Sequence, residues 1–287
     1  MCFFVRRNDS MGYGARVLID RLRERQANDK RLGQHFLHDE AVLDDTIQLA
    51  ELSDDDVVLE IGPGPGVLTE RLLDSGADLT CIELDEGACE NLLEIFPSLN
   101  LVTGDALQVK WPIVNKIVAN IPYQISSPLI EIITRQDRIS YVVMLLQEEF
   151  AERLVVKTVA DRGSLGLCTA LDWECEIVRR VAPNCFIPAP KINSSLVVMK
   201  RITPPSDSRF TKMLIRQAFS QRRKKLRNTL SKAPKRISRI KGWHAELYRD
   251  ALQSIDSPLL EQRPEDLDLQ QWQDLTKLFV DYKSSEG

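Results

Sequence analysis

The sequence predicts a Rossmann-like α/β sheet followed by a small C-terminal helical domain. From residue 57 onward, short apolar segments that each fit a buried parallel strand alternate with amphipathic segments. A glycine-rich turn at residues 62–66 follows the first of these strands, and a proline-rich linker at residues 203–207 precedes two further helical segments. Alternation of this kind predicts right-handed crossovers and a largely parallel sheet with helices on both faces.

The order of the elements divides the chain into three predicted regions. Residues 1–30 are interpreted as an N-terminal extension without identifiable chemistry, residues 31–203 as the sheet domain, and residues 204–287 as the helical domain. The last two strands, joined by a proline-rich loop, predict an antiparallel hairpin at one sheet edge. The predicted strands are Val57–Ile61, Leu79–Glu83, Leu99–Thr103, Lys116–Ala119, Ser140–Leu146, Trp173–Val181 and Ser195–Arg201, and the C-terminal helices are Phe210–Leu230 and Leu269–Tyr282.

The composition excludes several classes of protein. The 287 residues are 43% hydrophobic and 28% charged, and no apolar run approaches the roughly 18 residues of a membrane span. The six cysteines form no C-x-x-C pair and have no histidine at metal-ligand spacing, so we expect reduced thiols, no metal site and a cytoplasmic location. Six arginines within residues 1–30 leave a mitochondrial presequence as the alternative, which acidic residues in the same segment disfavour: Asp9, Asp20, Glu24 and Asp29.

The charge is distributed unevenly along the chain. The formal net charge is −4, yet residues 209–241 hold thirteen Lys and Arg side chains and no Asp or Glu, which leaves −17 for the rest. A run of cations is commonly only a solvated face, but thirteen without an acid repel one another unless a polyanion is bound. We therefore expect this segment to bind nucleic-acid phosphates, and the expected contacts are Arg222, Arg223, Lys224, Lys225 and Arg227.

A cofactor site is predicted at the carboxyl edge of the sheet. Gly62, Gly64 and Gly66 form G-x-G-x-G, whereas dinucleotide-binding proteins use G-x-G-x-x-G. Glu83 ends the second strand, where it can accept hydrogen bonds from ribose hydroxyls, and Asp105 follows the third strand, where it can accept one from an adenine amine. Alone, Glu83 would be a solvated carboxylate and Asp105 a helix N-cap. Together and in this order, the residues predict an S-adenosylmethionine site.

A second motif, Asn120-Ile121-Pro122-Tyr123, follows the fourth strand at the same sheet edge. The N6 amine of adenine is a weak nucleophile because its lone pair is delocalised into the ring. The Asn120 side-chain oxygen and the backbone carbonyl that precedes Pro122 can each accept an N6 hydrogen, which aligns the nitrogen with a methyl donor. Tyr123 offers a face to an extruded base. The alternative is a simple proline turn with Tyr123 as rim packing.

These motifs resemble those of the ribosomal RNA adenine N6,N6-dimethyltransferases, the KsgA family with its archaeal and eukaryotic relatives. The resemblance spans about residues 31–270 and implies a class I methyltransferase sheet, with cofactor-facing roles for Gln34, His35, Phe36 and Leu37. His35 stands where the family commonly has Asn, and alone it would be an ordinary surface histidine. The segments that carry the resemblance are Leu32–Leu37, Glu60–Gly64, Asn120–Tyr123, Phe186–Ser194 and Arg263–Leu267.

The resemblance implies a more specific site and substrate than the residues alone do. It makes Phe186 a second aromatic wall against the target adenine, opposite Tyr123, although Phe186 is equally consistent with a loop aromatic packed beneath two prolines. It also implies two adjacent adenosines near the 3′ end of small-subunit rRNA as targets, during small-subunit biogenesis, for a monomeric enzyme without a membrane partner. The alternatives are an Erm-like or mitochondrial relative that acts on another rRNA, and an assembly or transcription factor that does not need catalysis.

Overall fold

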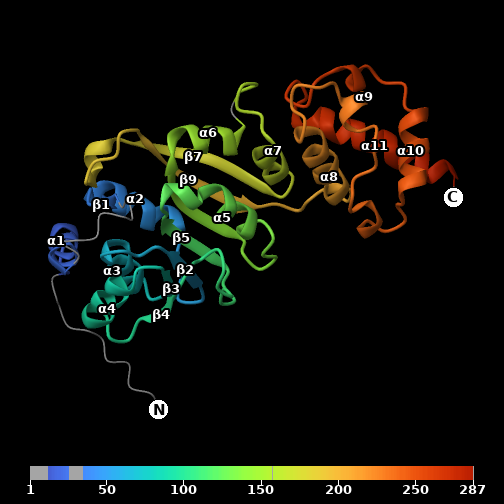
Figure 1. Cartoon of the computed structure of the whole chain (residues 1–287). Helices are drawn as coiled ribbons and strands as arrows, with labels where there is room; N and C mark the ends of the chain where they lie inside the picture. Colours follow the sequence, from blue (N-terminus) through green and yellow to red (C-terminus); the bar gives the residue numbers. More distant parts are fainter. Residues whose placement is uncertain (1–11, 26–34, 157, 287) are drawn as a thin grey trace, which may run out of the picture. The chain divides into compact units, whose positions relative to one another are not determined.

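The computed structural model describes residues 12–25, 35–156 and 158–286. Its large sheet has seven strands in the order β4-β3-β2-β5-β6-β9-β7, and a second, two-stranded sheet pairs β1 with β8 (Figure 1). The strands are β1 Phe36–Leu37, β2 Val57–Ile61, β3 Asp78–Glu83, β4 Asn100–Thr103, β5 Lys116–Asn120, β6 Tyr141–Gln147, β7 Trp173–Val181, β8 Phe186–Ile187 and β9 Ser194–Arg201.

Strands β4, β3, β2, β5 and β6 are joined by parallel pairings. Ile61 of β2 lies beside Ile82 of β3, and Asn120 of β5 lies beside Leu145 of β6. Because parallel strands end at the same edge, the residues that follow β2, β3, β5 and β6 are brought together there. The predicted α/β fold is confirmed, and β7 and β9 are neighbours at one end of the sheet.

Helices cover both faces of the parallel strands. Residues Val142 to Leu146 of β6 are buried without interruption, which is typical of a strand packed on both sides. Helix α2 packs against β5 and β6, and α3 and α4 pack against β3. The helices of this part are α1 Ala15–Arg25, α2 Glu40–Ala50, α3 Val67–Asp74, α4 Glu86–Ile95, the 3₁₀ turn η1 Tyr123–Ile125, α5 Ser126–Ile133 and the 3₁₀ turn η2 Pro183–Cys185.

Helix α1 belongs to the core, although the sequence suggested only an extension over residues 1–30. Leu18, Ile19 and Leu22 are fully buried, and α1 contacts α3 and α4. The Arg21 guanidinium donates to the Asn91 side-chain oxygen at 3.1 Å. An eleven-residue helix has too few apolar positions to show a clear period, so its packing was not evident from the sequence.

The chain forms two compact units, residues 1–147 with 178–198 and residues 148–177 with 199–287. The domain boundary expected near residue 203 lies close to the change of unit between residues 198 and 199. Residues 148–177, however, belong with the C-terminal helices. Leu167 and Leu171 share a core cluster with Phe210 and Leu214, which explains this assignment. Within the described ranges, no helix combines the length and apolar character that crossing a bilayer requires.

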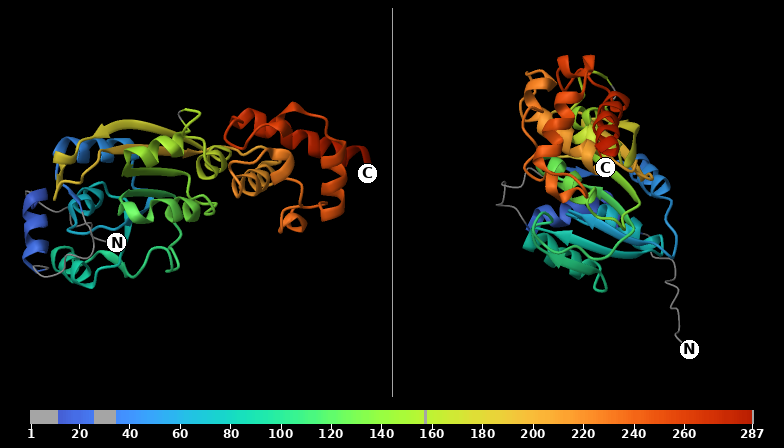
Figure 2. Two further views of the ribbon diagram at one scale, coloured as in Figure 1. Left: turned by 45° about the horizontal axis from the view of Figure 1, so that its top comes forward. Right: turned by 90° about the vertical axis from the view of Figure 1, so that its right-hand side faces the viewer.

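The C-terminal helices, drawn in orange to red, lie together in the ribbon diagram (Figure 2). Their shared core is rich in aromatic side chains. The predicted helix over residues 210–230 is interrupted at residues 220–225, where Arg222 and Lys225 pair with Glu265 and Glu261. The elements of the second unit are α6 Glu148–Val155, α7 Ser164–Ala170, α8 Ser208–Phe219, α9 Leu226–Thr229, η3 Ile237–Arg239, α10 Ala245–Ser254, η4 Pro258–Glu261 and α11 Leu269–Glu286.

Candidate active site

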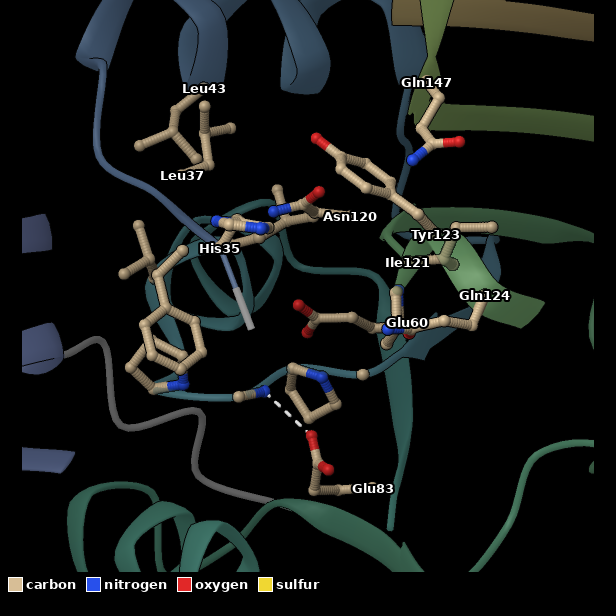
Figure 3. A pocket seen from close by; sticks show the side chains of 18 residues that line it. His35, Leu37, Leu43, Glu60, Glu83, Asn120, Ile121, Tyr123, Gln124 and Gln147 are labelled. Atoms are coloured by element: carbon tan, nitrogen blue, oxygen red, sulfur yellow. Dashed lines mark hydrogen bonds between the residues drawn. The ribbon is translucent and has the colours of Figure 1, made fainter. Parts of the chain in front are cut away.

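One pocket of about 460 Å³ lies at the carboxyl edge of the parallel strands (Figure 3). The glycine-rich turn after β2, Glu83 at the end of β3, Asn120 at the end of β5 and Gln147 at the end of β6 all line it. Two motifs that are far apart in the sequence therefore open into the same space. The residues predicted from the sequence that line this pocket are His35, Phe36, Leu37, Gly62, Gly64, Glu83, Asn120, Ile121, Pro122 and Tyr123.

Glu83 is held in place by backbone donors. The Gly64 N–H donates to Oε2 at 3.0 Å, and the N–H groups of Leu84 and Asp85 donate to Oε1 at 2.8 and 2.9 Å. Burial raises the pKa of Glu83, and these three hydrogen bonds oppose the rise. Each carboxylate oxygen accepts up to two hydrogen bonds, so Oε2 keeps an acceptor site for a ligand hydroxyl.

Two glycines of the turn serve different purposes. Gly64 has φ +54, and a Cβ there would lie 3.0 Å from the Phe36 ring in the pocket wall. Gly66 has φ +89, and a Cβ there would lie 2.8 Å from the Phe96 ring and 2.9 Å from Leu92. Gly66 does not line the pocket. The missing side chain at Gly66 lets α3 begin close to α4, and its contact with the cofactor stays a prediction.

Glu60 is a buried carboxylate that also faces the pocket (Figure 3). The Thr69 hydroxyl donates to its Oε2 at 2.7 Å, and the side chain is 1% exposed. Burial raises the pKa of Glu60 to about 7. Its position in the middle of the apolar strand Val57–Ile61 was the signal that the sequence offered, although we did not assign it to the site.

We expect Glu60 to make the stability of the ligand-free protein depend on pH. The folded chain holds a proton up to pH about 7 that the unfolded chain releases near pH 4.5, so the free energy of unfolding should fall as pH rises through this window. The contribution is at most about 3 kcal/mol. Urea titrations at pH 5 and pH 7.5 measure it, and Glu60→Gln should remove it. An identical pH dependence in both proteins would contradict this role.

Asn120 and Tyr123 stand next to each other in the pocket wall. Asn120 is half-buried at the end of β5, and Tyr123 begins the 3₁₀ turn that follows. The hydroxyl groups of Tyr123 and Ser194 are 2.6 Å apart, so a hydrogen bond fixes the far end of the ring. Burial raises the pKa of Tyr123. The phenol is therefore neutral at physiological pH.

The segment that resembles the family's cofactor-capping motif lies across the pocket. Leu37 pairs with Phe186 in the two-stranded sheet of β1 and β8, and the His38 N–H donates to the Cys185 carbonyl at 2.9 Å. His35 and Leu37 line the pocket, and Leu37 is buried. Gln34, which we also predicted to bind the cofactor, lies outside the described residues.

Two further predicted residues, Phe186 and Asp105, are not among those that line the pocket. Phe186 is 3% exposed and belongs to the core cluster, and its role as a second aromatic wall stays a prediction. Asp105 does not line the pocket either. Its carboxylate accepts hydrogen bonds from the Leu107 N–H at 2.9 Å and the Gln108 amide at 2.8 Å, which is a local capping role.

Sequence reasoning missed Gln147. Its amide lies at the pocket rim near Tyr123 (Figure 3). The available signal was its position, because Gln147 is the polar residue that ends a buried strand next to the Asn120 strand. Among residues 12–25, 35–156 and 158–286, no group of three or more His, Cys, Asp or Glu side chains is placed to hold a metal ion.

The five predicted RNA contacts divide into two classes within the second unit. Arg222 pairs with Glu265, and Lys225 and Arg227 pair with Glu261 at 3.0 and 2.6 Å. The acids that neutralise these cations come from residues 261–265, beyond the basic segment, so the local charge count missed them. Arg223 and Lys224 are exposed, and in the part of the chain that the structure describes neither has an ion pair.

Comparisons with known proteins agree with this geometry. The model of the family "Ribosomal RNA adenine dimethylase" matches residues 25–241. The Ribosomal RNA small subunit methyltransferase A of Synechococcus sp. (strain CC9902) is 42% identical over 223 residues, which cover 70% of this chain and 81% of that protein.

Two solved structures share the fold over most of their length. A dimethyladenosine transferase from Plasmodium falciparum matches with a TM-score of 0.67 and 26% identity, covering 86% of this chain and 98% of that chain. The 23S rRNA methyltransferase ErmE matches with a TM-score of 0.61 and 25% identity, covering 85% of this chain and 99% of that chain. With its family model matched over residues 25–241, this chain belongs to the ribosomal RNA adenine dimethylase family.

Proposed function

We propose that this chain dimethylates N6 of two adjacent adenosines near the 3′ end of small-subunit rRNA, with S-adenosylmethionine as the methyl donor. The observation that carries the proposal is the shared pocket, in which Gly62, Gly64 and Glu83 face the same space as Asn120 and Tyr123. A transferase needs its donor and acceptor sites in contact, so that the two reactants meet in line. A binding protein needs no such junction.

The residues of the glycine-rich side fit the proposed cofactor. Glu83 has an acceptor site left on Oε2 for a ribose hydroxyl, and the absence of a side chain at Gly64 keeps the pocket open beside Phe36. The bound cofactor supplies an electrophilic methyl group on a positively charged sulfur. Glu60 places a carboxylate in the same pocket, and its ionised form favours a cation there. Asp105 remains a prediction for the cofactor adenine, and it would have to exchange its Gln108 partner to bind.

The residues of the second motif fit the acceptor. The Asn120 side-chain oxygen and the Ile121 carbonyl accept the two N6 hydrogens, which leaves the nitrogen lone pair directed away from them and toward the methyl donor. Tyr123 stacks on the extruded base, and its hydrogen bond to Ser194 keeps the ring in one orientation. No group has to remove a proton before attack, because the amine is neutral. Preorganised acceptors of this kind lower the barrier without reorganising during the reaction.

The substrate assignment rests on the relatives. Small-subunit rRNA is named for the 42% identical relative, whereas ErmE, named for 23S rRNA, is 25% identical. We further propose that the protein acts as a monomer in the cytoplasm on the immature small subunit. Methylation of large-subunit rRNA is the second candidate, favoured by the likeness to ErmE. Primer extension on rRNA from a deletion strain separates the two, because restored stops at the small-subunit 3′ end support the first and restored stops in large-subunit rRNA support the second.

An assembly role without catalysis is a further alternative. It predicts that the Asn120→Ala protein restores ribosome assembly in a deletion strain as well as the wild type does, without restoring the methylated adenosines. Sucrose-gradient profiles together with primer extension measure both outcomes in one strain. Loss of both assembly and methylation in that strain, with normal protein levels, supports catalysis as the essential role.

Salt-dependent binding tests the division of the basic residues. Arg223→Gln with Lys224→Gln should flatten the dependence of RNA affinity on salt by about 1.5 units of slope, since each phosphate contact contributes roughly 0.7 to 0.9. The matched control is Arg222→Gln with Lys225→Gln, which should change the slope less, because these cations already have carboxylate partners. Filter binding at a series of KCl concentrations measures both slopes. A larger change of slope in the Arg222 and Lys225 variant than in the Arg223 and Lys224 variant would contradict this separation of paired from unpaired cations.

A further inference from the structure

The segment of residues 231–243 carries a second group of cations, apart from those at residues 222–227. Five of its thirteen residues are Lys or Arg, and none is Asp or Glu. All five cations are exposed. They are Lys232, Lys235, Arg236, Arg239 and Lys241.

The fold of the 231–243 segment directs its apolar side chains inward. Pro234, Ile237 and Trp243 are buried. Ile240 is half-buried against the same core, so an apolar residue recurs at every third position. The N–H groups of Ile237, Ile240 and Trp243 donate to the carbonyls three residues earlier at 2.9, 3.0 and 3.0 Å. Turns of this kind have about three residues per turn, which keeps the apolar positions on one side and leaves the cations on the other.

The cations of the 231–243 segment differ from most of those expected from the sequence to bind RNA. Arg222, Lys225 and Arg227 are already paired with carboxylates. Within residues 12–25, 35–156 and 158–286, no ion pair involves a cation of the segment. A paired cation has to exchange its carboxylate for a phosphate, whereas an unpaired one gives up only water and counterions. The segment is therefore the better prepared of the two surfaces to bind a polyanion.

The segment also leads away from the basic turn at residues 220–225. It begins beyond Thr229, whose carbonyl accepts a hydrogen bond from the Gln217 amide at 3.3 Å. It ends at Trp243, whose ring centroid lies 4.5 Å from that of Phe210. Gln217 is near the end of α8 and Phe210 is near its start, about 10 Å away along the helix axis. Because this is about one Debye length at physiological ionic strength, the far end of the segment can contact phosphates independently of the basic turn.

We propose that the 231–243 segment is a second phosphate-binding surface, which holds the sugar–phosphate backbone of RNA at a place apart from residues 222–227. The inference rests on the proposed function for the identity of the polyanion, an rRNA. Arg236 and Arg239 can each bind a phosphate through two N–H groups, and such contacts position RNA without reading its sequence. An anionic bilayer is the competing polyanion. It is disfavoured because a membrane-binding segment inserts apolar side chains, and those of this segment face the core.

Neutralising the segment should flatten the salt dependence of RNA binding. The variant combines Lys235→Gln, Arg236→Gln and Arg239→Gln. Its slope of log affinity against log KCl concentration should be smaller than that of the wild type by about 2 to 2.7 units, since each phosphate contact contributes roughly 0.7 to 0.9. The affinity at 0.1 M KCl should fall accordingly, by about 100- to 500-fold. Filter binding of a full-length small-subunit rRNA transcript in a KCl series measures both quantities.

Two control variants separate the charge of the segment from its folding and from the net charge of the protein. Arg236→Lys with Arg239→Lys keeps both charges and should keep the slope of the wild type. Arg16→Gln, Arg23→Gln and Lys110→Gln remove the same total charge from exposed positions of the first unit, and this variant should also keep the slope. Thermal unfolding of every variant shows whether it is folded.

A combined variant tests whether the two surfaces are separate. Arg223→Gln and Lys224→Gln are added to the three substitutions in the segment. Contacts that are separate should contribute additively, so the slope should fall by about 3.5 to 4.5 units in total. A total no larger than the effect of the segment substitutions alone would mean that the two groups of cations share one contact, which would contradict a second surface.

The inference fails on any of three further outcomes. One is an unchanged slope in the folded Gln variant of the segment, and another is an equal loss in the first-unit control. The third is binding to phosphatidylserine vesicles that the Gln variant loses while its RNA slope stays unchanged, which would assign the segment to a membrane. A wild-type protein that shows the expected slopes but transfers no methyl group would refute the proposed function and leave the surface in place. Normal methylation with unchanged slopes would do the reverse.

Discussion

Replacing Asn120 by alanine should lower the rate of methyl transfer about 100- to 1000-fold, the usual cost of removing one preorganised polar group from a reaction site. The Asn120 side-chain oxygen and the Ile121 carbonyl act on the geometry of the acceptor nitrogen. The affinity for S-adenosylmethionine should therefore remain nearly unchanged, because the glycine-rich turn and Glu83 are intact. Single-turnover transfer to small subunits, with calorimetric binding of the cofactor, measures the two quantities separately.

A matched control is available in the same sheet. Asn100 is an exposed asparagine at the start of β4 and does not line the pocket, so Asn100→Ala should leave transfer and binding as they are. Equal losses of transfer and cofactor affinity in Asn120→Ala would refute the assigned role of Asn120. So would full activity in a correctly folded Asn120→Ala protein.

Glu83→Gln should weaken cofactor binding by roughly 100-fold, about 2.7 kcal/mol, because one charged acceptor oxygen becomes an amide donor. In the wild type, the backbone N–H groups of Gly64, Leu84 and Asp85 donate to the carboxylate. In the variant, the amide NH₂ group would face some of these donors and could not accept from them. At saturating cofactor the rate of methyl transfer should recover substantially, since Glu83 does not contact the acceptor amine. Calorimetry and saturation kinetics with S-adenosylmethionine measure this split.

The control for Glu83 lies three residues away. Glu86 is an exposed glutamate at the start of α4, outside the pocket, and Glu86→Gln should bind cofactor like the wild type. Unchanged affinity in a folded Glu83→Gln protein would remove Glu83 from the cofactor site. A loss that saturating cofactor does not restore would move Glu83 to the acceptor side.

The parallel strands were predictable because each is a short, nearly continuous apolar run bounded by turn residues. Val57–Ile61 was predicted with the bounds that the structure has. So was Trp173–Val181, outside the parallel strands, where apolar and charged residues alternate. The helix predicted over residues 210–230 was not, because the ion pairs of Arg222 and Lys225 in its interruption involve Glu265 and Glu261, which are distant in the sequence. The second unit also takes α6 and α7 from the middle of the chain, an assignment that depends on packing between distant segments.

The pocket was predictable wherever function depends on a strand end, since topology alone places Gly64, Glu83 and Asn120 at one edge. It was not predictable where two loops meet. The pairing of β1 with β8 buries Phe186 and leaves His35 opposite Tyr123, and no local sequence pattern encodes that register. Asp105 has an equally local explanation, because its carboxylate caps the turn that follows it.

The central claim is that one pocket joins a methyl donor to the N6 amine of adenine in small-subunit rRNA. Transfer of labelled methyl groups from S-adenosylmethionine to immature small ribosomal subunits, followed by digestion to nucleosides, tests it most directly. The account predicts N6,N6-dimethyladenosine as the labelled product, at two adjacent positions near the 3′ end of the RNA. Label in another nucleoside, at another atom of adenine or only in large-subunit rRNA would contradict it.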